Sequence, residues 1–304
     1  MKLSLITALL LSSLPAICCA AQPAKPQGYP WVDIPQQQLV YLKLSSGVVV
    51  LQLADSFAPA HTQRFRELVK SGFYHGTHFY RVIDQFVLQA GLPEGEQHPS
   101  GHQSKWPALK AEFSWAVRAQ DPYRLVQRND LLASETGFNQ GFAVGRASGV
   151  EWLINCPNVV TMARSTDPDS ATTDFAIMQG QAPRHLDKNM SVFARVIWGG
   201  EHLNAVQRGE RSQGGFIQSP AKRSSIINAS LGSDLPTSQQ LPLQMMDTQS
   251  AEFADKLQNH RLRVDAFYQD KGNGNVDICY QQIPVRVAQA QAASVKAATQ
   301  GKGK

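Results

Sequence analysis

The sequence predicts a mainly β protein that carries a long insertion and a C-terminal α+β extension. Residues 79–91 form two short, mainly apolar runs on either side of Asp84-Gln85, as two strands around a tight turn do. Residues 40–53 supply two more apolar runs, and the pattern changes beyond Pro236. With 304 residues, of which 42% are hydrophobic, the chain is long enough for one substantial core and an appendage.

A helix is expected at about 58–71, after the first two apolar runs. Pro59 stands at a first-turn position, where its missing N–H does not interrupt a helix. Phe65 and Leu68 fall on one face, and Gly72 ends the pattern.

Residues 92–155 form an unusually long connection between two expected strands. A stretch of this length has its own structure or a functional reason. It contains a possible helix near 121–134 and two glycine-rich turns, at 137–141 and 145–149. We therefore treat it as an insertion into a main domain.

The main domain is expected to span residues 35–234. Its last part contains a strand at 192–198, a second short helix at 201–208 and a closing strand at 224–231.

The C-terminal extension is expected at residues 235–287. Asp247 or Thr248 can cap a helix whose apolar residues lie on one side. Residues 261–268 and 276–287 have the pattern of a hairpin around a glycine- and asparagine-rich turn.

The N-terminus has the features of a secretory signal peptide, residues 1–21. A short basic start precedes the apolar residues 3–17, and small residues follow from Cys18 to Ala21. Cleavage after Ala20 or Ala21 is favoured, and lipoprotein-type cleavage before Cys18 or Cys19 is the alternative. The short basic start favours bacterial export and a periplasmic location.

The segments that flank the folded part are expected to be unstructured. Residues 22–34 are polar and proline-rich, as in a stiff linker without a core pattern. Residues 288–304 are rich in alanine, glutamine and lysine and have the composition of a disordered tail.

Two cysteines, Cys156 and Cys279, remain once the signal peptide is removed. In an oxidising compartment an even number of cysteines favours a disulfide. The alternative is two unpaired buried thiols, and we expect the bond.

The charge pattern argues against nucleic-acid binding. The formal net charge is +5, no long basic run occurs, and aromatic residues do not alternate with cations. Apart from the signal peptide, we expect no stable membrane insertion.

Arg81 and Gln89 stand among apolar residues in the 79–91 segment. Since residues two apart share a face of a strand, Arg81 is expected to face with Phe79 and Ile83, and Gln89 with its neighbour Val87. A cation in such a position is costly unless it has a partner or a function.

This spacing resembles the active-site signature of cyclophilins, the peptidyl-prolyl cis-trans isomerases. Further blocks that are similar to the family follow in the correct order, at 40–53, 58–77, 160–164, 174–177 and 186–196. The resemblance implies a closed antiparallel β-barrel of about eight strands, capped by two helices.

The resemblance also implies the site. Arg81 matches the catalytic arginine, and Gln89 matches a glutamine that anchors a substrate carbonyl. The other expected substrate-binding residues are Phe86, Val87, Met162, Ala163, Arg164, Asp174, Phe175, Ala176, His185, Leu186 and Met190. Taken singly, Phe86, Val87, Met162, Phe175 and Leu186 fit an ordinary core better than a binding site. The resemblance favours the proline pocket for Phe86, Val87 and Leu186.

Four of these positions depart from the best-known members of the family. Asp174 stands where they have glutamine, Ala176 where they have a pocket phenylalanine, His185 where they have another aromatic residue, and Met190 where they often have histidine or tyrosine. Losing a ring at Ala176 removes apolar contact worth roughly 2–3 kcal/mol. The pocket is then wider, shallower or filled by the insertion.

Isomerisation of an Xaa-Pro bond needs rotation over a barrier of about 18–20 kcal/mol and breaks no bond, so no nucleophile, metal or cofactor is required. A guanidinium can stabilise the twisted amide by donating to the prolyl nitrogen. The alternative for Arg81 is a structural ion pair with Asp84.

We therefore expect a monomeric periplasmic isomerase that acts on proline-containing segments of exported proteins. The alternative is a proline-peptide binding module or holdase chaperone with weak or no turnover.

Overall fold

Two apolar runs on either side of a short turn form a hairpin of β2 (Leu39–Leu44) and β3 (Gly47–Leu53), as expected. The computed structural model describes residues 30–99, 101 and 106–288. The expected signal peptide, the first part of the expected linker and all of the expected tail except Ala288 lie outside these residues.

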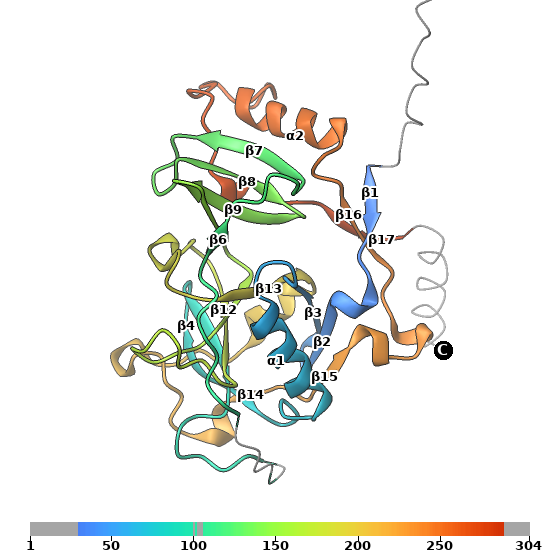
Figure 1. Cartoon of the computed structure of the whole chain (residues 1–304). Helices are drawn as coiled ribbons and strands as arrows, with labels where there is room; N and C mark the ends of the chain where they lie inside the picture. Colours follow the sequence, from blue (N-terminus) through green and yellow to red (C-terminus); the bar gives the residue numbers. More distant parts are fainter. Residues whose placement is uncertain (1–29, 100, 102–105, 289–304) are drawn as a thin grey trace, which may run out of the picture.

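A curled sheet of nine antiparallel strands contains this hairpin and forms the larger part of the molecule (Figure 1). The strand order is β14-β4-β5-β12-β11-β13-β3-β2-β15. The mainly β prediction is confirmed. The other strands of the sheet are β4 (His78–Ile83), β5 (Val87–Gly91), β11 (Val159–Met162), β12 (Phe175–Met178), β13 (Val192–Trp198), β14 (Ser224–Ser225) and β15 (Asn228–Leu231).

Residues 224–231, expected as one closing strand, bond to both edges of this sheet. β14 pairs with β4, and β15 pairs with β2. Between them, the N–H of Ile226 donates to the carbonyl of Thr77, and the N–H of Ile227 donates to that of Lys43. One short stretch of chain therefore connects the two ends of the strand order.

The concave face of the curled sheet packs on α1 (Pro59–Lys70), which begins and ends where the sequence predicts. Phe65 is fully buried, and its ring centroid lies 5.5 Å from that of Phe175 and 4.8 Å from that of Phe193. We call this the inner face of the sheet. Gly72 follows the helix with a positive φ of 74°, a conformation in which a Cβ would be strained.

The second expected helix, at 201–208, is a 3₁₀ helix at Gly200–Ala205 that lies against β3. Gly199 precedes it with a φ of 70°, and a Cβ there would lie 2.0 Å from the carbonyl oxygen of Val48. Only glycine therefore permits this close approach to β3.

The insertion forms a separate antiparallel sheet of five strands, in the order β6-β10-β9-β8-β7. The expected helix near 121–134 is wrong, because Asn129 turns the chain with a φ of 53° and β7 pairs with β8. Strand pairing replaces the local helical pattern. The strands are β6 (Trp115–Ala116), β7 (Tyr123–Arg128), β8 (Glu135–Asn139), β9 (Phe142–Ala147) and β10 (Val150–Leu153).

The C-terminal extension contributes a strand pair and one helix. β16 (Leu243–Met246) pairs with β17 (Val285–Val287) and with β1 (Trp31–Asp33), so the end of the expected linker is wrongly predicted and is a strand. α2 (Ala251–Leu262) begins after Ser250, whose Oγ accepts from the N–H of Phe253, rather than after Asp247 or Thr248.

The hairpin expected at 261–268 and 276–287 is wrong. α2 continues to Leu262, and only Val285–Val287 of this region is a strand. The intervening Val264 and Phe267 are exposed and find no partner strand among the described residues.

α2 lies across the insertion sheet (Figure 1), where the rings of Phe253 and Phe138 meet edge to face with centroids 5.5 Å apart. The disulfide between Cys156 and Cys279 joins the chain before β11 to the extension, and the expected bond is confirmed. In residues 30–99, 101 and 106–288, no helix has the length and apolarity to cross a bilayer.

Candidate active site

Arg81 and Gln89 lie directly opposite each other on β4 and β5, on the outer face of the curled sheet. The Nη1 of Arg81 donates to the Oε1 of Gln89 at 3.2 Å, and its Nε donates to the carbonyl of Gly214 at 3.0 Å. The guanidinium carbon also lies 5.6 Å from the centre of the Phe216 ring. Two hydrogen bonds and a ring therefore fix the orientation of the guanidinium.

A β-bulge changes the expected facing of Arg81. The register shifts between Phe79 and Arg81, so that Phe79 is in the inner core while Arg81 and Ile83 lie outside. The prediction that Arg81 shares a face with Phe79 is wrong for this reason, whereas its sharing with Ile83 is confirmed. A bulge redirects a side chain without ending the strand.

The bulge also brings Tyr80 to Gln89, a contact that strand alternation alone did not predict. The Nε2 of Gln89 donates to the hydroxyl of Tyr80 at 2.6 Å, and that hydroxyl donates to the Oδ2 of Asp174 at 2.7 Å. A chain of hydrogen bonds thus runs from Arg81 to Asp174. This chain fixes the orientation of the Gln89 side-chain amide, because the amide oxygen faces a donor and the amide nitrogen faces an acceptor.

Asp174 is withdrawn from water at the end of this chain. Its Oδ1 accepts from the N–H of Leu92 at 3.1 Å and from the hydroxyl of Thr173 at 2.9 Å. Burial raises the pKa of Asp174, although these donors act against the rise. Burial and the nearby Asp174 carboxylate together raise the pKa of Tyr80, so the phenol remains protonated.

The structural alternative for Arg81, an ion pair with Asp84, does not occur. The Oδ1 of Asp84 accepts instead from the Nε of Arg208 at 3.0 Å. Within the described part of the chain no carboxylate lies in ion-pair distance of Arg81, and its Nη2 makes no hydrogen bond. This leaves a charged donor for a substrate.

The apolar residues expected around the proline ring divide into three groups. Phe86 and Leu186 are half-buried, and the Phe86 ring stacks on the exposed His185 with centroids 6.4 Å apart. Val87 and Ala176 share the outer face with Gln89, but they are 3% and 4% exposed. Both belong to the same apolar cluster as residues of the insertion, such as Phe138.

The pocket beside Ala176 was expected to be wider, shallower or filled by the insertion. The burial of Ala176 favours the filled pocket. Met162 and Phe175 lie elsewhere, in the inner core with Phe65 and Phe79. Their side chains face away from Arg81, and we assign them to the core.

Ala163, Arg164 and Met190 lie on the loops that follow β11 and precede β13. The N–H of Ala163 donates to the carbonyl of Asp174 at 2.7 Å. The Nε of Arg164 donates to the carbonyl of Asn189 at 2.9 Å, which joins the two loops beside the half-buried Met190.

The insertion is tied to the pocket by charges that sequence analysis missed. The Nη2 of Arg184 donates to Asp130 of the insertion at 2.8 Å, and its Nε donates to Asp187 at 2.9 Å. Arg184 immediately precedes His185, and all three charged side chains are largely buried. Breaking a buried ion pair usually costs several kcal/mol, so this contact holds the insertion against the pocket.

The arrangement suits chemistry that breaks no covalent bond. It presents one oriented cation, an amide that is already hydrogen-bonded, and an apolar surface at Phe86 and Leu186. Among the described residues no group of three histidine, cysteine or acidic side chains has the spacing of a metal site.

Comparison with known proteins agrees with this geometry. The family model described as "Cyclophilin type peptidyl-prolyl cis-trans isomerase/CLD" matches residues 39–230, well over half of the chain. A protein of Brucella suis biovar 1 named "Probable peptidyl-prolyl cis-trans isomerase" is 27% identical over 206 residues, which cover 65% of this chain and 84% of that protein. "Peptidyl-prolyl cis-trans isomerase-like 1" of Homo sapiens is 45% identical over 56 residues, or 18% of this chain and 34% of that one.

The fold has a similar solved structure. The crystal structure of cyclophilin AquaCyp293 from Hirschia baltica aligns with a TM-score of 0.69 and 24% identity, over 85% of this chain and 94% of that chain. At this identity the likeness is one of fold.

Proposed function

This chain belongs to the cyclophilin-type peptidyl-prolyl cis-trans isomerases and is an isomerase enzyme, and we propose that it isomerises Xaa-Pro bonds of exported proteins through Arg81. The observation that carries the proposal is the guanidinium of Arg81, which Gln89 and Gly214 hold in place without a carboxylate partner.

Arg81 acts on the amide while it rotates. The planar amide uses the nitrogen lone pair in resonance, and the twisted amide returns it to the prolyl nitrogen. A donor next to that nitrogen therefore binds the twisted state more tightly, which is the requirement for catalysis. The free Nη2 of Arg81 is the donor, and Gln89 keeps it from turning away.

Substrate residues on either side of the rotating bond meet different parts of the site. The proline ring packs on Phe86 and Leu186, with His185 covering Phe86. The amide of Gln89 retains one N–H that Tyr80 does not use, and this N–H anchors a substrate carbonyl. Ala163, Arg164 and Met190 bind the peptide backbone from the neighbouring loops.

The finer features of the fold support the same assignment. Residues 224–231 bond to both β4 and β2, which supports a closed barrel, with α1 and the 3₁₀ helix at Gly200–Ala205 as its caps. The main domain then spans 35–234, with the insertion at 92–155 and the extension at 235–287.

The cellular setting is the remaining part of the proposal. The apolar N-terminal segment of the sequence supports export to the periplasm, and the disulfide is compatible with an oxidising compartment. The substrates are then proline-containing segments of exported proteins. The enzyme acts on them as a monomer.

A second function, a proline-peptide binding module or holdase with little turnover, is favoured by one observation. Ala176 supplies no ring to the proline pocket, and the space beside it is occupied by the buried cluster shared with the insertion. In that case peptides bind at Phe86 and Leu186 without faster rotation.

A protease-coupled assay with proline peptides distinguishes the two. We expect catalysis by the mature protein, and a loss of kcat/KM in Arg81→Ala equivalent to about 2–4 kcal/mol, as for one oriented donor. Arg81→Lys should recover little, because an ammonium lacks the planar fork. Arg128→Ala, at an exposed arginine of the insertion, is the matched control and should be unchanged. Normal turnover by Arg81→Ala contradicts the mechanism, and no turnover by the unaltered protein favours the binding module.

A further inference from the structure

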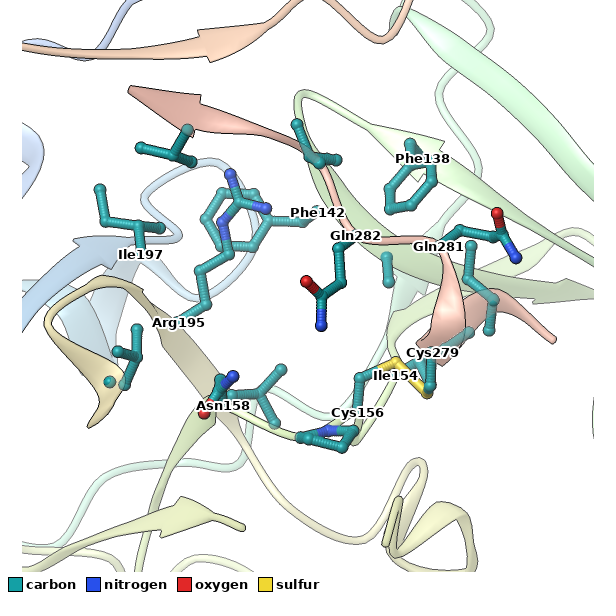
Figure 2. A pocket seen from close by; sticks show the side chains of 18 of the residues that line it. Phe138, Phe142, Ile154, Cys156, Asn158, Arg195, Ile197, Cys279, Gln281 and Gln282 are labelled. Atoms are coloured by element: carbon teal, nitrogen blue, oxygen red, sulfur yellow. A yellow bond between two sulfur atoms is a disulfide. The ribbon is translucent and has the colours of Figure 1, made fainter. Parts of the chain in front are cut away.

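A cavity separate from the Arg81 site lies between the curled sheet, the insertion and the extension (Figure 2). Its volume is about 770 Å³, within the range of small-molecule sites. β13 forms one wall, the insertion strand β9 forms another, and residues 278–285 of the extension form a third. Most of the side chains that line it are apolar, including Phe138, Leu153, Ile154 and Val192.

Arg195 of β13 points into this cavity beside Phe142 (Figure 2). Its Nε and Nη2 donate to the Oε1 of Gln52 at 3.1 and 2.8 Å, and Nη2 also contacts the sulfur of Met245 at 3.4 Å. Its Nη1 makes no hydrogen bond, and no carboxylate lies in ion-pair distance, among the residues that the structure describes. Burial lowers the pKa of Arg195 to about 10, so the group is still charged at neutral pH.

Arg195 is half-buried and has no anionic partner among the described residues, and a charge that is withdrawn from water is costly unless it is paired. Among the described residues, the other charged groups on the cavity wall are Lys256, a second cation, and Glu201, whose side chain is 74% exposed. The enclosed part of the cavity therefore carries positive charge. The amides of Asn158 and Gln282 also line it, and neither side chain has a hydrogen bond with a described residue.

We propose that this cavity binds a small organic carboxylate with an apolar body, of the type of a medium-chain alkyl carboxylate. Its head accepts from the Nη1 of Arg195, and the amide of Asn158 or Gln282 supplies a second donor. Its apolar body fills the space between Phe138, Leu153 and Val192. Most of the cavity wall is apolar, which suits the apolar body of a carboxylate better than a strongly hydrated phosphate group, so a carboxylate is the better match.

The disulfide makes this site depend on oxidation. Cys156 and Cys279 both line the cavity, and Cys279 holds the segment 278–285 against it. Reduction frees the third wall, and the bound carboxylate should then be released.

Calorimetry with the full mature chain and sodium decanoate tests the site. We expect saturable binding of decanoate and binding of decanamide weaker by about tenfold or more, since a charge-assisted hydrogen bond contributes roughly 1.5–3 kcal/mol. Arg195→Gln should reduce decanoate affinity to that of the amide. Arg286→Gln is the matched control, because Arg286 also donates to a glutamine, Gln244, and lies over the Trp31 ring, but it is outside the cavity.

A second variant keeps the test decisive if Arg195→Gln does not fold. Gln282 is exposed and lines the cavity, so Gln282→Trp should narrow it beside Arg195 and weaken decanoate binding by about tenfold or more while isomerase activity persists. Equal binding of decanoate and decanamide, undiminished binding to Gln282→Trp, or no binding of decanoate overturns the proposal. Binding only of an acetylated tripeptide with a free C-terminal leucine carboxylate also overturns it, because the ligand source is then a peptide.

Discussion

Arg81 and Arg195 lie on the outer face of the same curled sheet and are held in the same way, yet their surroundings differ. Each stands directly opposite a glutamine on the neighbouring strand, Gln89 or Gln52, and donates to its side-chain oxygen. Each lies beside a phenylalanine ring, with centroid distances of 5.6 and 4.8 Å. Neither pairs with a carboxylate among the described residues.

The difference between the two sites is their cover. Arg81 is flanked by the short loop that holds Gly214 and the exposed Phe216. Arg195 lines a cavity of about 770 Å³ whose other walls come from the insertion and the extension. The same arrangement, an arginine opposite a glutamine on the neighbouring strand, can thus act on a polypeptide or bind a small anion. The segments added to the sheet determine which of the two it does.

Removal of the disulfide should have the largest effect on stability. It should change the cavity of Arg195 and leave the Arg81 site intact. The bond joins residues 123 apart in sequence. In the chain-entropy model, loss of a bond that closes a loop of this size costs up to about 4–5 kcal/mol. We expect Cys156→Ser with Cys279→Ser to lower the free energy of unfolding, measured in urea, and to open the cavity of Arg195. Isomerase kcat/KM should change by less than about threefold, because the hydrogen bonds that orient Arg81 come from Gln89 and Gly214 and not from the extension. Unchanged stability, or loss of isomerase activity in a folded variant, contradicts this separation.

Ala176→Phe should have an intermediate effect, and it tests how the insertion meets the Arg81 site. Ala176 is 4% exposed within the cluster that includes Phe138, so a ring at this position has no room. Overpacking of this kind costs about 1–3 kcal/mol, which thermal unfolding can measure. Ala221→Phe, at an exposed alanine, is the control and should change stability by less than about 0.5 kcal/mol. Tighter binding of proline peptides to Ala176→Phe at full stability would mean that the pocket is open.

Asp174→Asn should have the smallest effect, and one that depends on pH. Burial raises the pKa of Asp174, so the folded protein holds this proton more tightly than the unfolded chain does. Its contribution to stability is therefore complete below the ordinary aspartate pKa of about 3.9 and is lost as the pH rises through the folded value. The unfolding free energy of Asp174→Asn relative to the unaltered protein should increase across this window. Urea unfolding at several pH values measures it, with Asp167→Asn at an exposed loop as control; a constant difference contradicts the expectation.

The sequence predicted the curled sheet better than the parts that were added to it. Strands such as β4 and β5 carry strong apolar runs around a turn, and α1 begins at a proline and ends before a glycine, so local signals agree with the fold. β7 carries a weaker pattern, and its pairing with β8 decided its structure. The predicted C-terminal hairpin failed because α2 continues through Arg261 and the disulfide holds Cys279 elsewhere.

The candidate site was predicted only in part. Arg81 and Gln89 were found from their unusual position among apolar residues, and their mutual hydrogen bond agrees with that reading. Tyr80 was missed because alternation places it on the opposite face, and a bulge is not visible as a pattern. Arg195 and Gln52 were missed because their pairing depends on strand register between distant segments, which no single stretch of sequence encodes.

The central claim is that Arg81 accelerates rotation rather than only binding proline. Exchange NMR on an Xaa-Pro peptide at equilibrium measures the cis–trans rate and the binding of the peptide together. For Arg81→Lys we predict an exchange rate lower by about 30-fold or more and a peptide Kd within about threefold of the unaltered protein, as for a group that acts mainly in the transition state. An exchange rate equal to that of the unaltered protein, with the variant folded, would contradict the account.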